Sequence, residues 1–164
     1  MPDRAWPAAQ YARYRTEVRE EWIDYNGHLH DAGYAIVLSE ANEMLLADLG
    51  LSETYRVDTG RAMYTVESHI RYLAESNRGD VLQAASLLVS ADPRRIRVHT
   101  LLSRADGTPI ATGEHLYVHV QKAGGGVTAM PADRWAAVEA LLSAQASLDR
   151  PPHIGRGVGA PRPS

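Results

Sequence analysis

Apolar residues recur every three or four positions in two segments of the chain, and this spacing predicts two helices. The first helix is expected over residues 32–49, where the apolar positions are numerous enough to be enclosed on most sides, and Gly50 marks its end. Asp31 is the expected N-cap of this helix. The second helix, over 131–147, presents its apolar residues on one face only.

Elsewhere apolar and polar residues alternate, which predicts five strands. One strand, over 14–22, precedes the long helix; the others, near 64–72 and over 81–91, 96–104 and 110–121, follow it and are joined by short turns. We interpret the polar face of the strand near 64–72 as a solvated or oligomer-facing surface. That face is expected to carry Thr65, Glu67, His69 and Arg71, and the opposite face Tyr64, Val66, Ile70 and Tyr72.

The order of these elements predicts an α+β fold in which an antiparallel sheet wraps around one long central helix. A chain of 164 residues suits one domain with a single core. We expect an irregular arm over 1–14, the main domain over 15–122, a C-terminal helix over 131–148, and a disordered tail rich in Pro, Gly and Arg over 150–164.

The composition of the chain excludes several classes of function. There is no cysteine, which rules out disulfides, thiolate zinc sites and a cysteine nucleophile. The net charge of -3 argues against nucleic acid as a partner. No apolar run approaches the ~20 residues that span a bilayer, and the first residues lack the apolar core of a signal peptide. We therefore expect a soluble, cytoplasmic protein with no membrane partner.

The segment 22–31 carries the most chemistry in the chain. It reads Trp-Ile-Asp-Tyr-Asn-Gly-His-Leu-His-Asp and leads into the long helix. The carboxylate of Asp24, the imidazoles of His28 and His30, and a turn at Gly27 therefore come just before a helix N-terminus, where negative charge is stabilised. Considered alone, Asp24 is more simply explained as a turn-forming residue.

Three blocks of sequence, taken in order, resemble the hotdog-fold acyl-CoA thioesterases of the 4-hydroxybenzoyl-CoA thioesterase type. The blocks are residues 24–29 with the helix 33–49, residues 66–73 with 79–82, and residues 106–107 with 111–120. The stretches 21–28 and 64–73 are similar to the betainyl-CoA thioesterases of carnitine catabolism. The resemblance covers residues 15–121 and implies a hotdog fold. It also implies hydrolysis of a short or polar acyl-CoA, with betainyl-CoA as one candidate.

This resemblance implies that Asp24 is the catalytic carboxylate. It would act as a general base that activates water, or as a nucleophile that forms a mixed anhydride, and the sequence leaves both routes open. His28 is a second candidate for the catalytic site. The backbone N–H groups of Asp31, Ala32 and Gly33 would polarise the thioester carbonyl, and Gly33 would also let the backbone approach a ligand closely.

Other residues are candidates for holding the substrate. The candidates near the acyl group are Trp22, Tyr25, Asn26, His30, Tyr34 and Tyr64. Asn26 is favoured as a turn residue, whereas the four aromatic residues could form a cage for a trimethylammonium group. The arginines that could meet the phosphates of coenzyme A are Arg71, Arg78, Arg94 and Arg95. The fold further implies a homodimer or a dimer of dimers, with sites at the interface.

Two other functions remain open for the same fold: a hotdog hydratase or dehydratase, and a catalytically idle sensor that binds acyl-CoA. No cofactor is expected, because coenzyme A is part of the substrate. No metal is expected either. His115 and His119 share one face of a strand but lie roughly 13 Å apart, and no third ligand is clustered with them.

Overall fold

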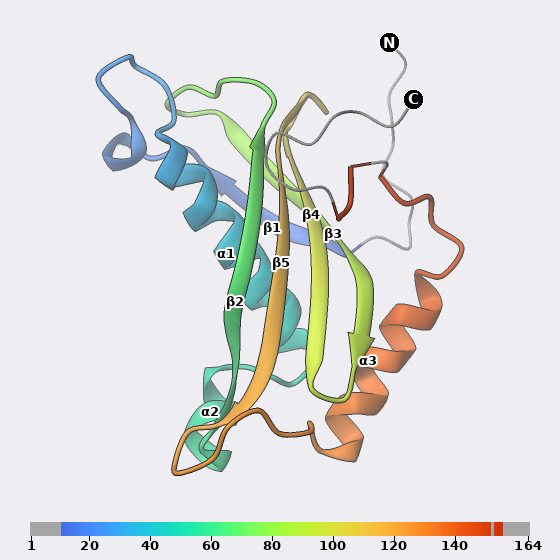
Figure 1. The fold of residues 1–164 in the computed structure, drawn as a ribbon. Helices are drawn as coiled ribbons and strands as arrows, with labels where there is room; N and C mark the ends of the chain where they lie inside the picture. Colours follow the sequence, from blue (N-terminus) through green and yellow to red (C-terminus); the bar gives the residue numbers. More distant parts are fainter. Residues whose placement is uncertain (1–10, 152, 156–164) are drawn as a thin grey trace.

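The computed structural model describes residues 11–151 and 153–155, and its centre is an antiparallel sheet that lies against a long helix (Figure 1). The strand order is β1-β3-β4-β5-β2. The predicted α+β fold, with its central helix and C-terminal helix, is confirmed. In chain order the elements are β1 (Tyr11–Glu17), the 3-10 turn η1 (Glu20–Trp22), α1 (Asp31–Asp48), α2 (Glu53–Thr59), β2 (Arg61–Tyr72), β3 (Val81–Asp92), β4 (Arg95–Arg104), β5 (Pro109–Gln121) and α3 (Ala132–Ala144).

The helix α1 packs one apolar face against the sheet. Val37, Leu38 and Leu45 are fully buried on this face and belong to the two core clusters between α1 and the strands. Burial of each such side chain contributes about 1.5–3 kcal/mol, so this face fixes the position of α1. The expectation that α1 is enclosed on most sides is wrong for the single chain, because Ile36 and Met44 on its other side are exposed. None of the helices in the described part of the chain is long and apolar enough to cross a membrane.

Two expected boundaries near the N-terminus are wrong. The first strand begins at Tyr11, inside the expected irregular arm, and ends at Glu17, after which residues 20–22 form a 3-10 turn. The helix α2 was not expected, because its seven residues are too few to display a helical pattern. Its ends are nevertheless local signals: Ser52 Oγ accepts from the N–H of Tyr55 at 3.4 Å, and Gly60 adopts a φ of +66°. The remainder of the expected arm lies outside the described residues.

A β-bulge in β2 reverses the expected facing of its first half. The register between β2 and β5 shifts between Thr65 and Glu67, so Val66 is an extra residue. Residues that pair directly across a ladder point to the same face, and Tyr64 pairs with Val118 while Glu67 pairs with Leu116. Because Leu116 and Val118 are two positions apart on β5, Tyr64 shares a face with Glu67. Its expected grouping with Ile70 and Tyr72 is therefore wrong.

The segment after α3 completes one edge of the sheet. β1 pairs with β3 only as far as Ser86, so the second half of β3 needs another partner within the described residues. Gln145 supplies it with a buried amide, which accepts from the N–H of Leu88 at 2.7 Å and donates to the C=O of Ser86 at 3.1 Å. The side chain of Gln145 thus takes the place of a neighbouring strand's backbone.

Gln145→Leu is expected to lower the free energy of unfolding by about 2–4 kcal/mol, because it leaves a buried N–H and a buried C=O without their partner. Urea denaturation monitored by circular dichroism measures this loss. Gln83→Leu is the matched control, because Gln83 is half-buried on the same strand and its side chain bonds to none of the described residues. Equal losses for the two variants would contradict the role given to Gln145.

The expected disorder of the tail is wrong for its described part. Residues 150–155, apart from 152, lie against the sheet on the face opposite α1, beyond the C-terminal end of α3 in Figure 1. Arg150 donates to the C=O of Val89, and the N–H of Gly155 donates to Glu114 Oε2 at 2.9 Å. The tail beyond residue 155 lies outside the described residues. Composition alone cannot reveal these contacts, because they depend on where the sheet places its polar groups.

Candidate active site

The loop that carries Asp24 is a tight turn closed by that residue. Asp24 Oδ1 accepts from the N–H of Asn26 at 2.8 Å and from the N–H of His28 at 3.3 Å. The main chain closes the same loop, with the N–H of Asp24 donating to the C=O of His28 at 2.9 Å. Gly27 has a φ of +84°, a conformation that glycine adopts without strain. Asp24 therefore has the turn-forming role that the sequence suggested, and this role leaves its carboxylate ionised.

The pKa of Asp24 lies below its usual value. Burial acts to raise the pKa, but hydrogen bonds from the N–H groups of Asn26 and His28 outweigh burial because they stabilise the anion. At neutral pH the group is thus a carboxylate, the form that either a general base or a nucleophile requires.

Backbone contacts hold this loop between the start of α1 and the connection from β2 to β3. His28 forms an isolated bridge with Asn77, Leu29 N–H donates to the C=O of Ser76 at 2.7 Å, and His30 N–H donates to the C=O of Trp22 at 2.8 Å. The loop is therefore fixed on both sides by main-chain atoms, which places Asp24 without reliance on flexible side chains.

The N-terminus of α1 differs in one detail from the expectation: His30 is the N-cap, and Asp31 is the first helical residue. The N–H of Ala32 lies 2.8 Å from Asp31 Oδ1 and 3.1 Å from His30 Nδ1. Asp31 Oδ1 also lies 2.5 Å from His30 Nδ1, so both side chains contribute to the first turn of the helix. The N–H of Gly33 donates to the C=O of His30 at 2.8 Å.

Of the three N–H groups expected to polarise a carbonyl, two are thus engaged within the turn. The N–H of Asp31 donates to none of the described residues and remains available to a ligand. Gly33 allows a close approach within the chain itself. A Cβ there would lie 2.4 Å from Leu29 Cδ1 and 3.5 Å from Trp22 Cβ, so glycine allows α1 to pack on its own preceding loop.

The two histidines of the motif occupy different surroundings. His28 is half-buried, and its Nε2 lies 3.4 Å from a carboxylate oxygen of Glu75. Its backbone N–H is the group that bonds to Asp24, so His28 helps to position the carboxylate whatever its ring does. His30 is exposed and caps α1.

The four aromatic residues expected to form a cage do not come together within the chain. Trp22 is buried in the core with the guanidinium of Arg19 over its ring, and Tyr25 is 96% exposed at the tip of the loop. Tyr34 is buried, with its hydroxyl donating to the C=O of Ala74 at 2.9 Å. Tyr64 lies on the sheet face opposite α1 because of the bulge in β2. The cage prediction is therefore wrong for these residues.

The arginines expected to bind phosphate are also dispersed. Arg78 precedes β3, whereas Arg94 lies in the turn after β3 and Arg95 begins β4, roughly 35 Å away along the strand. Arg78 forms an ion pair with Glu20, and Arg95 forms one with Asp92 at 2.9 Å. Arg71 lies on β2, at the level of Thr112 on β5. No single phosphate site within one chain contains all of them.

The histidines of β5 are part of the core. His115 Nδ1 lies 3.3 Å from the amide nitrogen of Asn42 on α1, and His119 Nε2 lies 2.8 Å from the hydroxyl of Tyr55. Burial lowers the pKa of both histidines. Within the described residues, no three His, Cys, Asp or Glu side chains are grouped so that they could hold a metal ion. A buried polar chain that the sequence did not indicate links His115 to β3 through Asn42, Thr100 and Ser86.

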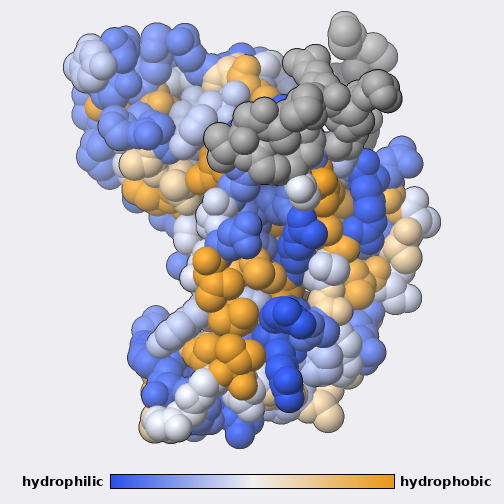
Figure 2. Space-filling model, viewed as in Figure 1, coloured by the Kyte–Doolittle hydropathy of each residue, from blue (hydrophilic) through white to orange (hydrophobic). Residues whose placement is uncertain are grey.

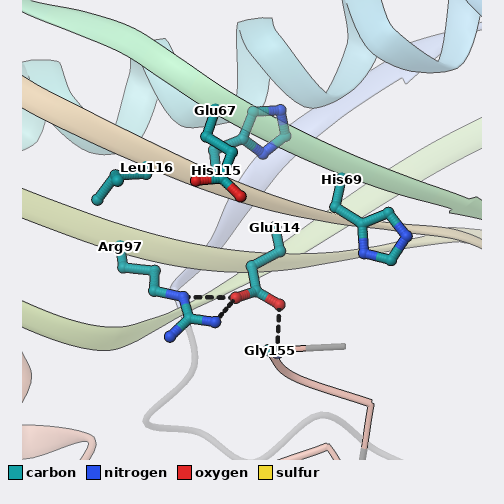
Figure 3. A pocket seen from close by; sticks show the side chains of 7 residues that line it. All are labelled: Glu67, His69, Arg97, Glu114, His115, Leu116 and Gly155. Carbon is teal, nitrogen blue, oxygen red and sulfur yellow. Dashed lines mark hydrogen bonds and ion pairs between the residues drawn. The ribbon is translucent and has the colours of Figure 1, made fainter. Parts of the chain in front are cut away.

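The polar residues of β2 line a groove on the face opposite α1. Figure 3 shows Glu114 pointing towards Arg97 and Gly155, which bind its carboxylate. The groove has a volume of about 320 Å³, and Asp24 is not part of its wall. It is lined by Glu67, His69, Arg97, Glu114, His115, Leu116 and Gly155. The C-terminal segment thus covers part of the polar sheet face.

A sequence model of the thioesterase-like superfamily matches residues 9–144. The chain belongs to the thioesterase-like superfamily. The predicted family is thereby confirmed, and the motif 22–31 lies inside the matched region.

Relatives within this family include the betainyl-CoA thioesterase of Pseudomonas aeruginosa, which is 35% identical over 90% of this chain and 94% of its own length. The L-carnitine dehydrogenase/betainyl-CoA thioesterase of Agrobacterium fabrum is 38% identical over 91% of this chain, which spans only 30% of that longer protein.

Solved structures agree with the fold. A Staphylococcus aureus protein in complex with CoA has a TM-score of 0.86 and 26% identity, covering 93% of this chain and 96% of its own. The 1,4-dihydroxy-2-naphthoyl-CoA thioesterase of Synechocystis, at 21% identity, matches with a TM-score of 0.68 over 84% of this chain and 97% of its own. The hotdog fold is therefore confirmed for this superfamily member.

Proposed function

We propose that this protein hydrolyses acyl-CoA thioesters, with Asp24 as the catalytic carboxylate. The observation that carries the proposal is the ionised Asp24 carboxylate, held by main-chain N–H groups in the loop that leads into α1. Membership of a thioesterase superfamily supports the same reaction. The N–H of Asp31, which bonds to none of the described residues, is suited to the carbonyl oxygen, whose negative charge grows as the tetrahedral intermediate forms.

Two routes fit this arrangement. In the first, Asp24 accepts a proton from water, the water oxygen bonds to the thioester carbon, and the C–S bond then breaks to release CoA as a thiolate that takes up a proton. In the second, Asp24 itself bonds to the carbon and expels the thiolate, and water hydrolyses the resulting anhydride. Mass spectrometry of enzyme quenched during turnover separates the routes, because only the second leaves the acyl group on Asp24.

The substrate we propose is a short acyl-CoA with a polar acyl group, and betainyl-CoA is its first candidate. The names of relatives at 35% and 38% identity support this choice. The longer relatives also carry a dehydrogenase name, and this chain spans only 30% of the Agrobacterium fabrum protein.

We also infer that the active protein is a dimer joined through β2. This twelve-residue strand lies at an edge of the sheet, and its outer side pairs with no strand in the described part of the chain. Such an edge invites pairing with another copy. Exposed Val66 and Tyr64 lie along it, and Figure 2 shows apolar side chains over the lower half of β2 and β5, with the molecule hollowed beside the middle of α1 and β2. Light scattering after size exclusion measures the mass.

The experiment that tests the function is release of free thiol from a panel of acyl-CoAs. The panel includes betainyl-CoA, acetyl-CoA, a medium-chain acyl-CoA and 4-hydroxybenzoyl-CoA. Each is assayed at enzyme concentrations above and below the one at which the dimer dissociates. We expect turnover of at least the short polar member. Tight binding of acyl-CoA without thiol release would contradict the proposal and favour a sensor.

A further inference from the structure

Tyr72 is an exposed aromatic residue outside the motif 22–31, and it lies beside the first turn of α1. It ends β2 and pairs with Ala111, a residue of the core under α1, so its ring lies on the α1 face of the sheet. The ring is 53% exposed and packs edge-on against Tyr34, with centroids 5.4 Å apart and planes at 80°. Tyr34, in contrast, is 4% exposed. Tyr72 therefore presents a solvent-exposed ring that packs on the buried ring of Tyr34.

The ring of Tyr34 is held in place, and the carboxylate of Asp31 lies near it. The hydroxyl of Tyr34 is bonded to the C=O of Ala74, which fixes the ring against which Tyr72 packs. Asp31 precedes Tyr34 by three residues, so the two share a face of α1 one turn apart. The Asp31 side chain is exposed, and its contacts with described residues are to its neighbours, the imidazole of His30 and the N–H of Ala32. Its charge, after burial, is the second cause that raises the pKa of Tyr72.

We propose that the ring of Tyr72 and the carboxylate of Asp31 form the subsite for a positively charged acyl group, and so select quaternary ammonium acyl-CoAs. The inference rests on the proposed function, because it assigns the acyl end of that substrate. An aromatic face and a carboxylate both attract a cation, and neither favours a neutral group of the same shape. Tyr72, at the end of β2, thus supplies the aromatic contact with a cation that was expected from the cage.

The position suits a short acyl chain. In a betainyl group one carbon separates the carbonyl from the ammonium, so the cation must bind close to where the carbonyl is held. Asp31 carries both the N–H proposed for the carbonyl and the carboxylate proposed for the cation. Pairing of β2 with a second copy would use the backbone groups at the strand's edge, so it would leave the ring of Tyr72 open on the α1 face of the strand.

The test compares two acyl-CoAs of nearly equal shape: trimethylammonioacetyl-CoA and its neutral isostere 3,3-dimethylbutanoyl-CoA. The measured quantity is the ratio of their kcat/KM values. We expect the wild type to prefer the cation by about tenfold or more, and Tyr72→Leu or Asp31→Asn to reduce this ratio by about 3- to 30-fold. Tyr72→Phe keeps the ring and is expected to keep most of the ratio.

Tyr11→Leu is the matched control, because Tyr11 donates to Asp48 at 2.7 Å and thus forms a tyrosine–aspartate pair at the other end of α1. Its ratio should equal that of the wild type. A wild-type ratio near one, or a ratio unchanged in both Tyr72→Leu and Asp31→Asn, would overturn the subsite while hydrolysis itself still stands. Absence of hydrolysis with every acyl-CoA would instead overturn the proposed function.

Discussion

Asp24→Asn is expected to lower kcat for acyl-CoA hydrolysis by about 10²- to 10⁴-fold while the protein stays folded. The substitution removes the group that accepts a proton or attacks the carbonyl. It keeps a side-chain oxygen that can accept from the N–H of Asn26 and of His28, so the loop retains its shape. Thiol release measures kcat, and thermal denaturation verifies the fold.

The chain contains a close structural match for the control. Asp106 closes another exposed turn, with Asp106 Oδ1 accepting from the N–H of Thr108 at 2.8 Å and Gly107 at a φ of +85°. Hydrogen bonds from Thr108 also lower the pKa of Asp106. Asp106→Asn therefore repeats the same chemical change in the same kind of turn, and its kcat should equal that of the wild type. If both variants retain full activity, Asp24 has no part in the chemistry.

The motif around Asp24 could be predicted from the sequence because its contacts join residues that are close together in the chain. Asp24 bonds to residues two and four positions later, and the turn residue Gly27 lies between them. The long helix, the strands from β3 to β5 and the C-terminal helix were likewise predicted within a few residues, because each has a sustained period and clear turn signals.

The bulge in β2 and the substrate subsite could not be read in the same way. One extra residue at Val66 changes the facing of all residues on one side of it, and nothing in an alternating pattern marks its position. Tyr72 meets Tyr34 only because β2 ends beside the first turn of α1. Their separation in sequence hides the pair, whereas Trp22 and Tyr25, which belong to the motif 22–31, lie in the core and in solvent.

The C-terminal segment shows the same limit of sequence reasoning. Its Pro, Gly and Arg content is typical of disorder, yet His153 Nε2 lies 2.9 Å from Nε2 of His99 on β4. His99 is 3% exposed, and the two rings have centroids 5.0 Å apart. A polar group buried in the sheet face needs a partner, and the tail supplies one.

The stability of the protein is expected to fall by about 3 kcal/mol between pH 6.5 and pH 4 because of His99. Burial first, and the neighbouring His153 second, lower the pKa of His99 from 6.5 to about 4. Between these two pH values the unfolded chain binds a proton that the folded protein excludes, so acid favours unfolding. Each pH unit of this interval corresponds to 1.36 kcal/mol. Above pH 6.5 the effect of His99 on the free energy of unfolding is constant, and below pH 4 the loss of stability caused by His99 is complete.

The other charged groups around His99 do not change this sign. Glu114 raises the pKa of His99 and Arg71 lowers it, and both effects are smaller than that of burial. Hydrogen bonds from Arg94 and Thr108 lower the pKa values of Asp92 and Asp106, so these carboxylates destabilise the fold only at a pH below the usual 3.8. The pH range in which His99 destabilises the fold therefore lies above the range in which these carboxylates do. A loss of stability on acidification above pH 4 is due to histidine.

Urea denaturation at intervals from pH 7.5 to pH 4 measures the effect, with His99→Gln as the comparison. The variant lacks the titrating ring, so its free energy of unfolding should depend less steeply on pH in this window, whatever its value at pH 7.5. Proton NMR of the His99 ring follows the same protonation directly and should place its midpoint near pH 4. Parallel pH profiles for wild type and variant would mean that His99 accepts its proton in the folded state as easily as in the unfolded one, contrary to its burial under the C-terminal segment.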